Sequence, residues 1–435
     1  MLDSFYGSLP RKSLPCLRYP PSLLCRALFL ALCIFSLAPA AASAAGGLAG
    51  VQADLSHQMK IAGTGSSAYV YDLTAKQALF SERATALRPP ASVEKLFTAT
   101  TALQRLGPTA RLSTSVLGAG ALNPGGIWEG SLYLRGGGDP TFGSSSFIRS
   151  HYGARGASIS TLAGELVRVD GIHAITGSVY GDESYFDSLR GEPSSNFHPD
   201  PFLEGSLSGL AFNRGMSGSE KGSHAPAAYA ARQLWAALKN DGVSIHGSST
   251  AASTPPGALA LAQVNSPTIT QLLGLMLPPS DNFFAEMLLK DLGAAFGGAG
   301  TTAAGASIVS QTISALLGIH PHVVDGSGLS EADRTSTYQV ADLLVELAPT
   351  PIGAVLRGNL AVAGHTGTLS HRMRGTGASG RCQGKTGTLT GFSNLAGYCQ
   401  AANGHLLAFA FFNDGISTTL AHVIQDHMTI TLAGY

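Results

Sequence analysis

The sequence predicts an α+β fold in which the two ends of the chain share one sheet covered by helices, with a long insertion between them. Residues 67–81 alternate and then reverse, which is typical of a β-hairpin. Residues 383–412 contain three further strand-like runs, and helical patterns precede and follow them. A hairpin with a helix at one end, and a strand meander with a helix at the other, favour an α+β arrangement.

The composition is that of a globular protein with more than one domain. The chain has 435 residues, of which 44% are hydrophobic and 12% charged, and this length exceeds what one compact core usually holds. Lysine and arginine together number 27, as do aspartate and glutamate, so the formal net charge is zero. Nucleic-acid-binding proteins normally carry a basic excess, so we expect no nucleic-acid partner.

The first 44 residues have the pattern of an export signal. Residues 27–38 form an apolar run that is short for a transmembrane helix, and Ala42-Ser43-Ala44 offers small residues for cleavage. We therefore predict a signal peptide at 1–44 and an exported protein of the periplasm, the extracellular space or the cell wall. An uncleaved membrane anchor is the alternative. The basic residues that precede the apolar run are Arg11, Lys12, Arg18 and Arg26.

The first part of the predicted sheet domain spans residues 45–107. A helical pattern covers 48–61, and the hairpin follows at 67–81. From residue 92 to 106, apolar residues recur at helical spacing. The face that they form consists of Leu96, Ala99, Leu103 and Leu106.

Residues 108–262 differ in texture and are predicted to form the inserted domain, as one module or two. Short strand-like pieces are separated by glycines, with helical stretches at 158–169 and 226–239. The strand-like pieces are 111–117, 130–134 and 174–180.

The sheet domain is predicted to resume at 263–435. Helical patterns return at 268–277 and 283–292, and a last helix begins near Ser417. The three strands between them are predicted at 383–389, 393–400 and 405–412.

Ser92 and Lys95 form a Ser-x-x-Lys pattern at the start of a predicted helix. Residues i and i+3 share a helical face, so the Lys95 amine can lie beside the Ser92 hydroxyl. A serine needs a nearby base to act as a nucleophile, and a lysine can serve when burial or another cation lowers its pKa. Alone, the pattern is weak evidence, because a capped helix with a solvated lysine produces it as well.

Ser280-Asp281-Asn282 precedes an apolar helical run. A Ser-x-Asn turn can point a hydroxyl and an amide into a cleft. Taken alone it is a plain helix cap, since all three residue types are preferred there.

Lys385-Thr386-Gly387-Thr388 opens a predicted strand. Gly387 leaves one face of the strand free of a side chain, so a ligand's backbone can approach, and Lys385 with Thr386 can hold a carboxylate. An ordinary edge strand is the alternative. His365-Thr366-Gly367 is a similar triplet, which we reject because only the later one leads into a clear hairpin.

These three motifs, in this order, are the signature set of penicillin-binding proteins and serine β-lactamases. Nearly the whole chain after the signal resembles the D-alanyl-D-alanine carboxypeptidase/endopeptidase family of the penicillin-binding protein 4 type, peptidase family S13. The resemblance implies a β-lactamase/transpeptidase-like domain, an antiparallel sheet flanked by helices, interrupted by the inserted segment. Further segments that fit the family are 134–141, 280–288, 325–330 and 385–391.

The resemblance implies acyl transfer that requires no metal and no cofactor. Ser92 would attack the penultimate D-Ala carbonyl of a peptidoglycan stem peptide, Lys95 would accept its proton, and Ser280 would relay a proton to the leaving amine. Water would then hydrolyse the ester, and β-lactam antibiotics would be covalent inhibitors. The expected enzyme is a serine-type D-Ala-D-Ala carboxypeptidase, with DD-endopeptidase activity as a further option. The sequence does not indicate an oligomeric state.

The resemblance also implies substrate-binding roles. Asn282 would hold the substrate's peptide group, and Lys385 with Thr386 or Thr388 would bind the terminal carboxylate. The backbone N–H groups of Thr388 and of the nucleophile would form the oxyanion hole.

Two alternatives are weighed against this interpretation. A β-lactamase or esterase of the same fold is disfavoured by the large insertion and because no Glu-x-x-Leu-Asn segment follows Asn282. A catalytically silent wall-binding homologue is disfavoured because all three motifs are intact.

Asp139 is a further candidate for substrate contact. It follows three glycines, which let the backbone lie close to a neighbour. In the family the inserted domain borders the cleft, so this carboxylate could meet the amine of a stem-peptide diamino acid. A turn residue of an Asp-Pro pair is the alternative.

Two cysteines follow the predicted signal, Cys382 and Cys399. If Thr388 pairs with Ser393 in the predicted hairpin, the same register places the two cysteines directly opposite each other. An exported protein meets oxidising conditions, so a cross-strand disulfide is expected, with two free thiols as the alternative. The other three cysteines, all within the predicted signal, are Cys16, Cys25 and Cys33.

Overall fold

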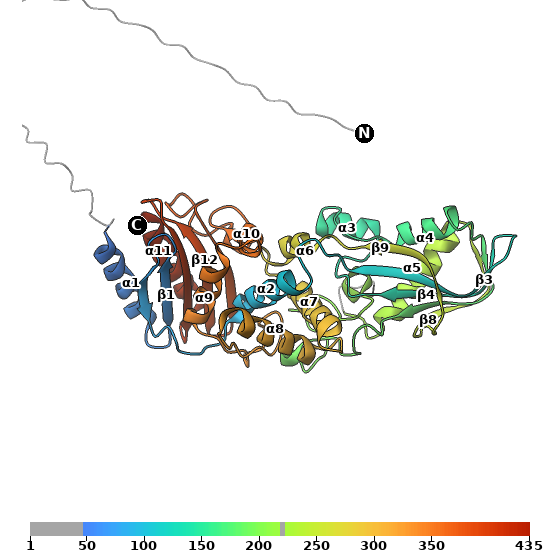
Figure 1. The fold of residues 1–435 in the computed structure, drawn as a ribbon, viewed down its shortest axis with the longest axis horizontal. Helices are drawn as coiled ribbons and strands as arrows, with labels where there is room; N and C mark the ends of the chain where they lie inside the picture. Colours follow the sequence, from blue (N-terminus) through green and yellow to red (C-terminus); the bar gives the residue numbers. More distant parts are fainter. Residues whose placement is uncertain (1–46, 218–221) are drawn as a thin grey trace, which may run out of the picture. The chain divides into compact units, whose positions relative to one another are not determined.

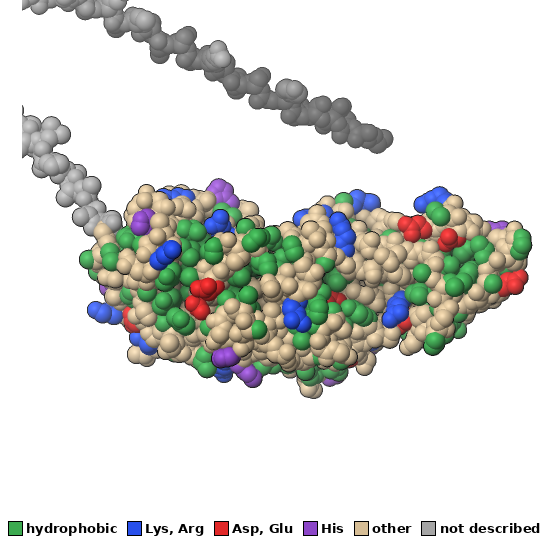
Figure 2. Space-filling model, viewed as in Figure 1, with side chains coloured by type: hydrophobic (Ala, Val, Ile, Leu, Met, Phe, Trp, Pro, Cys, Tyr) green, Lys and Arg blue, Asp and Glu red, His purple; other side chains and the backbone are tan. Residues whose placement is uncertain are grey.

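The computed structural model describes residues 47–217 and 222–435. The predicted signal peptide and its three cysteines therefore lie outside the described residues. Within those two ranges no single helix is long and apolar enough to cross a membrane. Two helices joined at a sharp bend, Thr337–Leu347 and Pro351–Gly358, are together long and apolar enough by length and composition alone. Charged side chains are sparse and mixed in sign on the face drawn in Figure 2.

A six-stranded sheet joins the two ends of the chain (Figure 1). Its order is β10-β11-β12-β13-β1-β2, with β1 antiparallel to β13, which confirms that both ends share one sheet. The strands are β1 (Ser67–Asp72), β2 (Gln77–Glu82), β10 (Ala361–Val362), β11 (Cys382–Leu389), β12 (Phe392–Gln400) and β13 (Leu406–Asp414).

Helices cover both faces of this sheet because its central strands are apolar on both. Along β13, Phe409 and Phe411 belong to the core beneath α1 and α11, while Ala410 and Phe412 belong to the core on the other face. Side chains alternate across a strand, so a continuous apolar run is what a doubly covered sheet requires. The helices are α1 (Leu48–Ala62) and α11 (Thr418–Gly434) on the first face, and α2 (Lys95–Arg105), α6 (Ile269–Met276), α7 (Asn282–Phe296), α8 (Thr302–Leu317), α9 (Thr337–Leu347) and α10 (Pro351–Gly358) in the core of the second.

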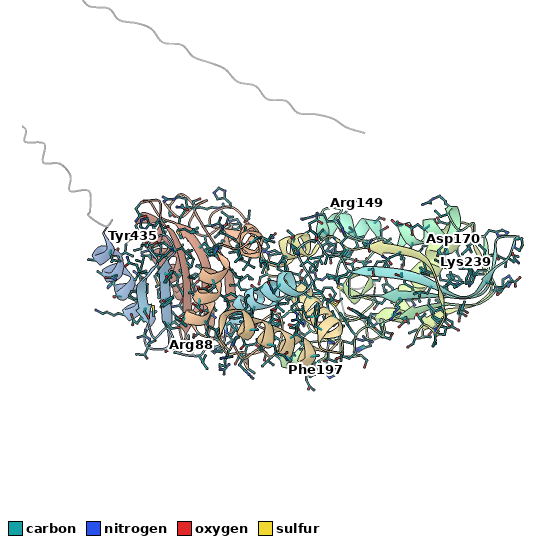
Figure 3. The ribbon with its side chains drawn as sticks, viewed as in Figure 1. Arg88, Arg149, Asp170, Phe197, Lys239 and Tyr435 are labelled. Atoms are coloured by element: carbon teal, nitrogen blue, oxygen red, sulfur yellow. A yellow bond between two sulfur atoms is a disulfide. The ribbon has the colours of Figure 1, made fainter. Side chains whose placement is uncertain are left out.

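The C-terminus is tied back to the sheet. The ring of Tyr435, labelled in Figure 3, meets that of His405 edge-on with the ring centres 5.9 Å apart. Its carbonyl oxygen accepts a hydrogen bond from the N–H of Asn403 at 2.9 Å.

A second sheet of seven strands lies in the middle of the chain (Figure 1). β3, β4 and β9 pair antiparallel, and the shorter strands β5 to β8 join the far side in parallel pairs. It has its own apolar core with α4 and α5. The elements are β3 (Ser113–Leu122), β4 (Ile127–Gly136), α3 (Ser145–Tyr152), α4 (Ile159–Arg168), β5 (Ala174–Ile175), β6 (Val179–Asp182), α5 (Pro226–Asn240), β7 (Ser244–Ile245), β8 (Ser249–Ala251) and β9 (Leu259–Asn265).

The strands of this sheet differ from the sequence-based expectation. β3 and β4 have 10 residues each, longer than predicted, because their glycines hide the alternation. Gly118 is needed where it stands, since a Cβ there would lie 2.1 Å from the Trp128 ring. β9 pairs with β3, so the sheet runs to Asn265. The division into a sheet domain and an inserted domain at 108–262 stays a prediction.

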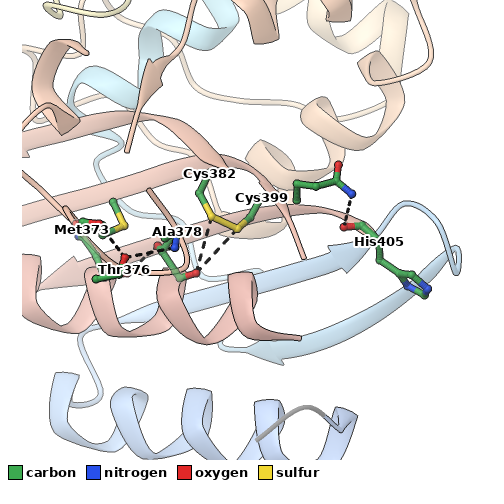
Figure 4. The surroundings of a disulfide bond; sticks show 9 residues. Met373, Thr376, Ala378, Cys382, Cys399 and His405 are labelled. Carbon is green, nitrogen blue, oxygen red and sulfur yellow. Dashed lines mark hydrogen bonds between the residues drawn. A yellow bond between two sulfur atoms is a disulfide. The ribbon is translucent and has the colours of Figure 1, made fainter. Parts of the chain in front are cut away.

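The predicted register of the β11–β12 hairpin is confirmed. Thr388 faces Ser393, and Cys382 faces Cys399. The structure joins the two cysteines in a disulfide with their Cα atoms 4.0 Å apart. Figure 4 shows the bond between the hairpin and α11, where each sulfur lies 4.0 Å from the carbonyl oxygen of Thr429.

Candidate active site

The Ser-x-x-Lys segment lies at the start of α2. A short 3₁₀ turn, η1 (Ala91–Glu94), precedes the helix, and Ala91 has a left-handed backbone with φ of 48°. Lys95 Nζ lies 2.9 Å from Ser92 Oγ. Ser92 is partly exposed, whereas Lys95 is fully buried. The serine residue is thus partly accessible to solvent, while the lysine beside it is shielded from water.

The Lys95 amine has three partners. Besides Ser92, it donates to Asn282 Oδ1 at 2.6 Å and to the Ser327 carbonyl oxygen at 2.7 Å. These two oxygens can only accept. In the neutral amine they take both N–H bonds, which leaves the nitrogen lone pair directed at Ser92 Oγ. The arrangement suits an amine that accepts the serine proton.

Burial, and not the charges around it, shifts the Lys95 amine towards its neutral form. Burial lowers the pKa of Lys95 from 10.5 to about 8, although nearby carboxylates, Asp325 first among them, pull it upward. Burial also holds the pKa of Lys385 well below its usual value, and the charge of Lys95 adds to this effect. A pKa near 8 leaves a useful fraction of the amine unprotonated at neutral pH.

Four carboxyls surround the Lys95 side of the site, and all are fully buried. We call Glu94, Glu286, Asp325 and Asp333 the carboxyl cluster. Burial raises the pKa of each of them. The sequence analysis included Glu286 and Asp325 in family-like segments but assigned them no role.

Glu286 and Asp325 hold the loop that presents the Ser327 carbonyl to Lys95. Glu286 Oε1 accepts from the N–H groups of Gly326 and Ser327 at 2.9 and 2.8 Å. Asp325 accepts from the N–H groups of Gly328 and Ser330 at 2.6 and 2.7 Å. Two buried carboxyl side chains therefore hold the backbone of this loop in place.

The Ser280-Asp281-Asn282 turn begins α7. Ser280 is partly exposed and has a left-handed backbone with φ of 67°. Asp281 caps α7, as its Oδ1 accepts from the Phe284 N–H at 3.0 Å. Asn282 points its Oδ1 at Lys95 and donates from Nδ2 to the Phe202 carbonyl at 2.8 Å. The segment is therefore both a helix cap and a part of the site.

The Lys-Thr-Gly strand packs directly against the serine turn. A Cβ on Gly387 would lie 2.6 Å from the Pro90 carbonyl oxygen and 3.0 Å from Ser92 N. The glycine is thus required by the protein's own backbone, which corrects the expectation that the open face serves a ligand. Asn394 Nδ2 ties β12 to the same turn through the carbonyl oxygens of Pro89 and Pro90, at 3.0 and 2.8 Å.

The edge of β11 next to this turn is open. β10 pairs only with Gln383 and Gly384, so within 47–217 and 222–435 no strand pairs with Lys385–Leu389 on that side. An extended peptide can add to such an edge. Lys385 is buried and donates to the Thr386 carbonyl at 2.8 Å, while Thr388 is exposed.

The structure supports the choice of the third motif. His365-Thr366-Gly367 lies outside the strands and leads into a single 3₁₀ turn, η4, which begins at Gly367 and ends at Leu369. The segment still borders the site, because the Thr368 and Thr386 hydroxyl oxygens lie 2.8 Å apart.

Asp139 is not brought to the site. The residue is only 2% exposed, and its Oδ1 accepts from the backbone N–H and the hydroxyl of Thr141 at 2.8 and 2.7 Å. Its neighbour is Asp291 of α7, whose pKa is raised first by burial and then by the charge of Asp139. A carboxyl buried in this way offers no surface to a substrate amine.

A cavity of about 870 Å³ adjoins the turn that begins α7. Its wall includes Pro201, next to the Phe202 that bonds Asn282, and Arg214, which pairs with Asp281. The other lining residues are His151, His198, Pro199, Asp200, Glu204, Gly205, Met216, Gly222 and His224.

Comparison with known proteins settles the family. The model of the D-Ala-D-Ala carboxypeptidase 3 (S13) family matches residues 49–200 and 203–435. The chain belongs to this family.

Curated relatives and solved structures agree with this assignment. A D-alanyl-D-alanine carboxypeptidase of Actinomadura sp. is 29% identical over 86% of this chain and 82% of its own. A carboxypeptidase of Mycobacterium tuberculosis is 30% identical over 75% and 71%. The crystal structure of penicillin binding protein 4 from Haemophilus influenzae has a TM-score of 0.74 at 20% identity, covering 88% of this chain and 99% of that one.

Membership of the S13 family establishes the class of enzyme. The protein is a serine peptidase of the D-Ala-D-Ala carboxypeptidase type with the penicillin-binding protein fold, and it acts on peptidoglycan. Its substrate places its action outside the cytoplasm.

Proposed function

We propose that Ser92 is the acylated nucleophile of this S13 enzyme and that Lys95 is its general base. The observation that carries the proposal is the buried Lys95 amine, 2.9 Å from Ser92 Oγ, whose other two partners are obligate acceptors. Ser92 Oγ forms a bond to the penultimate D-Ala carbonyl carbon, and its proton passes to Lys95 Nζ. Collapse of the tetrahedral intermediate breaks the peptide bond and releases D-Ala.

The remaining roles are proposed from membership of the S13 family, which shares these motifs. The N–H groups of Ser92 and Thr388 stabilise the oxyanion, since strand and turn are packed together at Gly387. Ser280, in the exposed turn, passes a proton to the leaving amine. Lys385, with Thr386 or Thr388, binds the terminal carboxylate. Water then hydrolyses the ester and regenerates the serine.

Asn282 completes the substrate-binding side. Its amide nitrogen has two N–H donors, and the Phe202 carbonyl accepts from one. The second N–H is available to a substrate carbonyl, while the amide oxygen stays on Lys95.

β-Lactams are proposed to acylate the same serine of this chain. A β-lactam complex of the Haemophilus influenzae protein is known. We further propose that residues 1–44 direct export and are then removed, and that carboxypeptidase activity is accompanied by DD-endopeptidase activity on crosslinked peptides.

Labelling with fluorescent penicillin, followed by mass mapping of the modified peptide, tests the nucleophile. We expect one label, on Ser92, and none in Ser92→Ala, whose melting temperature should stay close to that of the unsubstituted protein. Ser379→Ala, a serine outside the three motifs, is the control and should label normally. A label on another serine would overturn the assignment.

Two activity assays separate the alternatives. Release of D-Ala from a stem pentapeptide, and cleavage of a crosslinked dimer, measure the two peptidase activities. Rapid turnover of a chromogenic cephalosporin would favour the β-lactamase alternative. Absence of any penicillin label would favour the catalytically silent one.

A further inference from the structure

Arg214 stands on an unusual stretch of backbone. Asn213, Arg214 and Gly215 have φ values of 50°, 62° and 67°, and non-glycine residues keep such conformations only where the surrounding structure imposes them. Asn213 is pinned on both sides, since its Oδ1 accepts from the Ser144 N–H and its own N–H donates to the Phe142 carbonyl, each at 2.9 Å. The strained segment directs Arg214 towards α7.

The Arg214 guanidinium binds the Ser-Asp-Asn turn through Asp281. Nη1 and Nη2 donate to the two oxygens of Asp281 at 2.6 and 3.1 Å. The guanidinium carbon lies 4.7 Å from the centre of the Phe283 ring, and the side chain is 6% exposed. A two-pronged ion pair with so little water access has a defined geometry that a lysine cannot reproduce.

The same guanidinium holds the loop on the other side of Asn282. Nε donates to the Glu204 carbonyl at 2.7 Å and Nη2 to the Leu203 carbonyl at 3.3 Å. The preceding residue is Phe202, whose carbonyl accepts from Asn282 Nδ2. The Arg214 side chain therefore binds the residues next to both partners of the hydrogen bond between Asn282 and Phe202.

This link decides which way the Asn282 amide faces. A carbonyl oxygen accepts only from the nitrogen end of an amide, so Phe202 selects the orientation that leaves Oδ1 for Lys95. We propose that Arg214 is a positioning residue that orients Asn282, and through it Lys95, so that the 108–262 segment completes the catalytic centre. This inference rests on the proposed function of Lys95 as base.

Arg214→Lys and Arg214→Gln test the proposal, with Arg190→Lys as the matched control. Arg190 lies in the same segment and makes a two-pronged pair with Glu183 at 2.7 and 2.9 Å, but its partners do not include the residues around Asn282. We expect the second-order rate of penicillin acylation to fall about 10–100-fold in both Arg214 variants, because small misplacement of a catalytic group has effects of this size. Arg190→Lys should stay within about threefold of the unsubstituted rate.

The pH profile distinguishes positioning from general loss of structure. A flipped Asn282 would turn its N–H groups towards Lys95, which disfavours the ammonium form, so the midpoint of the acylation profile should move to lower pH. The midpoint in Arg190→Lys should not move. Arg214→Lys keeps a positive charge opposite Asp281. The test can therefore be carried out with this variant if Arg214→Gln fails to fold.

Three results would count against the inference. Acylation within threefold of the unsubstituted rate in folded Arg214 variants would overturn it, as would an equal loss in Arg190→Lys. If the unsubstituted protein is not acylated on Ser92 at all, the proposed function fails and the inference fails with it.

Discussion

Helix α7 carries two buried carboxyls, Glu286 and Asp291, that have different surroundings. Glu286 accepts two backbone hydrogen bonds from the loop that contacts Lys95. Asp291 has no hydrogen-bond donor for either oxygen among the described residues, and its neighbour is a second carboxyl, Asp139. Burial raises the pKa of both Glu286 and Asp291. The free-energy cost of burying an ionisable carboxyl is thus present at two points on α7.

The difference between the two regions lies in what the carboxyls organise. The carboxyls around Glu286 hold the loop that presents the Ser327 carbonyl to Lys95. A substitution there therefore alters the surroundings of Ser92. Around Asp291, the backbone is packed so tightly that a Cβ on Gly138 would lie 1.9 Å from the Asp291 carboxyl. Two adjacent carboxyls cannot both ionise cheaply. This second region therefore affects stability and its dependence on pH, and the glycines before Asp139 serve packing.

Lys95→Met should have the largest effect. It removes the proposed base and the basic group that faces the carboxyl cluster, so we expect penicillin acylation to slow about 10²–10⁴-fold, the range for loss of a general base. Stopped-flow or gel-based labelling over hours measures this rate. Lys239→Met, on α5, is the control and should label normally. A loss below tenfold would exclude Lys95 as the base.

Acylation by the unsubstituted protein should depend strongly on pH. The pKa of Lys95 is lowered to about 8, so the neutral base is scarce below this value and predominant above it. The rate should rise about tenfold per pH unit up to roughly pH 8 and then level off. A profile that is flat between pH 6 and pH 8 would contradict the assignment.

Glu286 offers two substitutions with opposite expectations. Gln keeps an oxygen for the Gly326 and Ser327 N–H groups. Burial already raises the pKa of Glu286 to about 8, so a neutral side chain resembles the state at pH 7. The acylation rate of Glu286→Gln should therefore stay within a few-fold of the unsubstituted rate at pH 7. Glu286→Leu leaves two buried N–H groups unpaired, at about 1–3 kcal/mol each. It should slow acylation about tenfold or more. Equal rates for the two variants would show that the hydrogen bonds do not matter.

Asp291→Asn should act on stability alone. The pKa of Asp139 is raised to about 6 by burial, above its unfolded value of 3.8, so the folded state binds the extra proton. The associated stability is full below about pH 4 and is lost as pH rises through about 6. The pKa of Asp291 is raised well above its usual value by burial and then by Asp139, so the stability lost through this carboxyl also grows with pH. An Asn at 291 removes that loss, so the melting temperature should rise at pH 8 and less so at pH 5. Asp241→Asn, on the surface, is the control, and an unchanged pH dependence would refute the account.

Local patterns predicted much of the fold and the three motifs. The helix and hairpin near the N-terminus, α4, α5, α7 and the meander of β11 to β13 follow from apolar spacing and turn residues. Ser92 and Lys95 meet because they are three residues apart on one helical turn. Cys382 and Cys399 face each other because hairpin register follows from the position of the turn. The two residue pairs are separated by only 3 and 17 residues of chain.

The contacts that define the rest of the site span much longer separations, which local patterns do not encode. Lys95 meets Asn282 and Ser327, which are 187 and 232 residues away. Arg214 reaches Asp281 across 67 residues, and its strained backbone has no signature in the sequence. Asp139 looked like a ligand contact from its glycines, yet packing against α7 buries it. The sequence alone determined which groups are proposed to carry the chemistry, because motif spacing on a helix or strand is local. Only the tertiary structure decided how these groups are oriented and charged, because burial and through-space hydrogen bonds depend on which distant segments come to lie together.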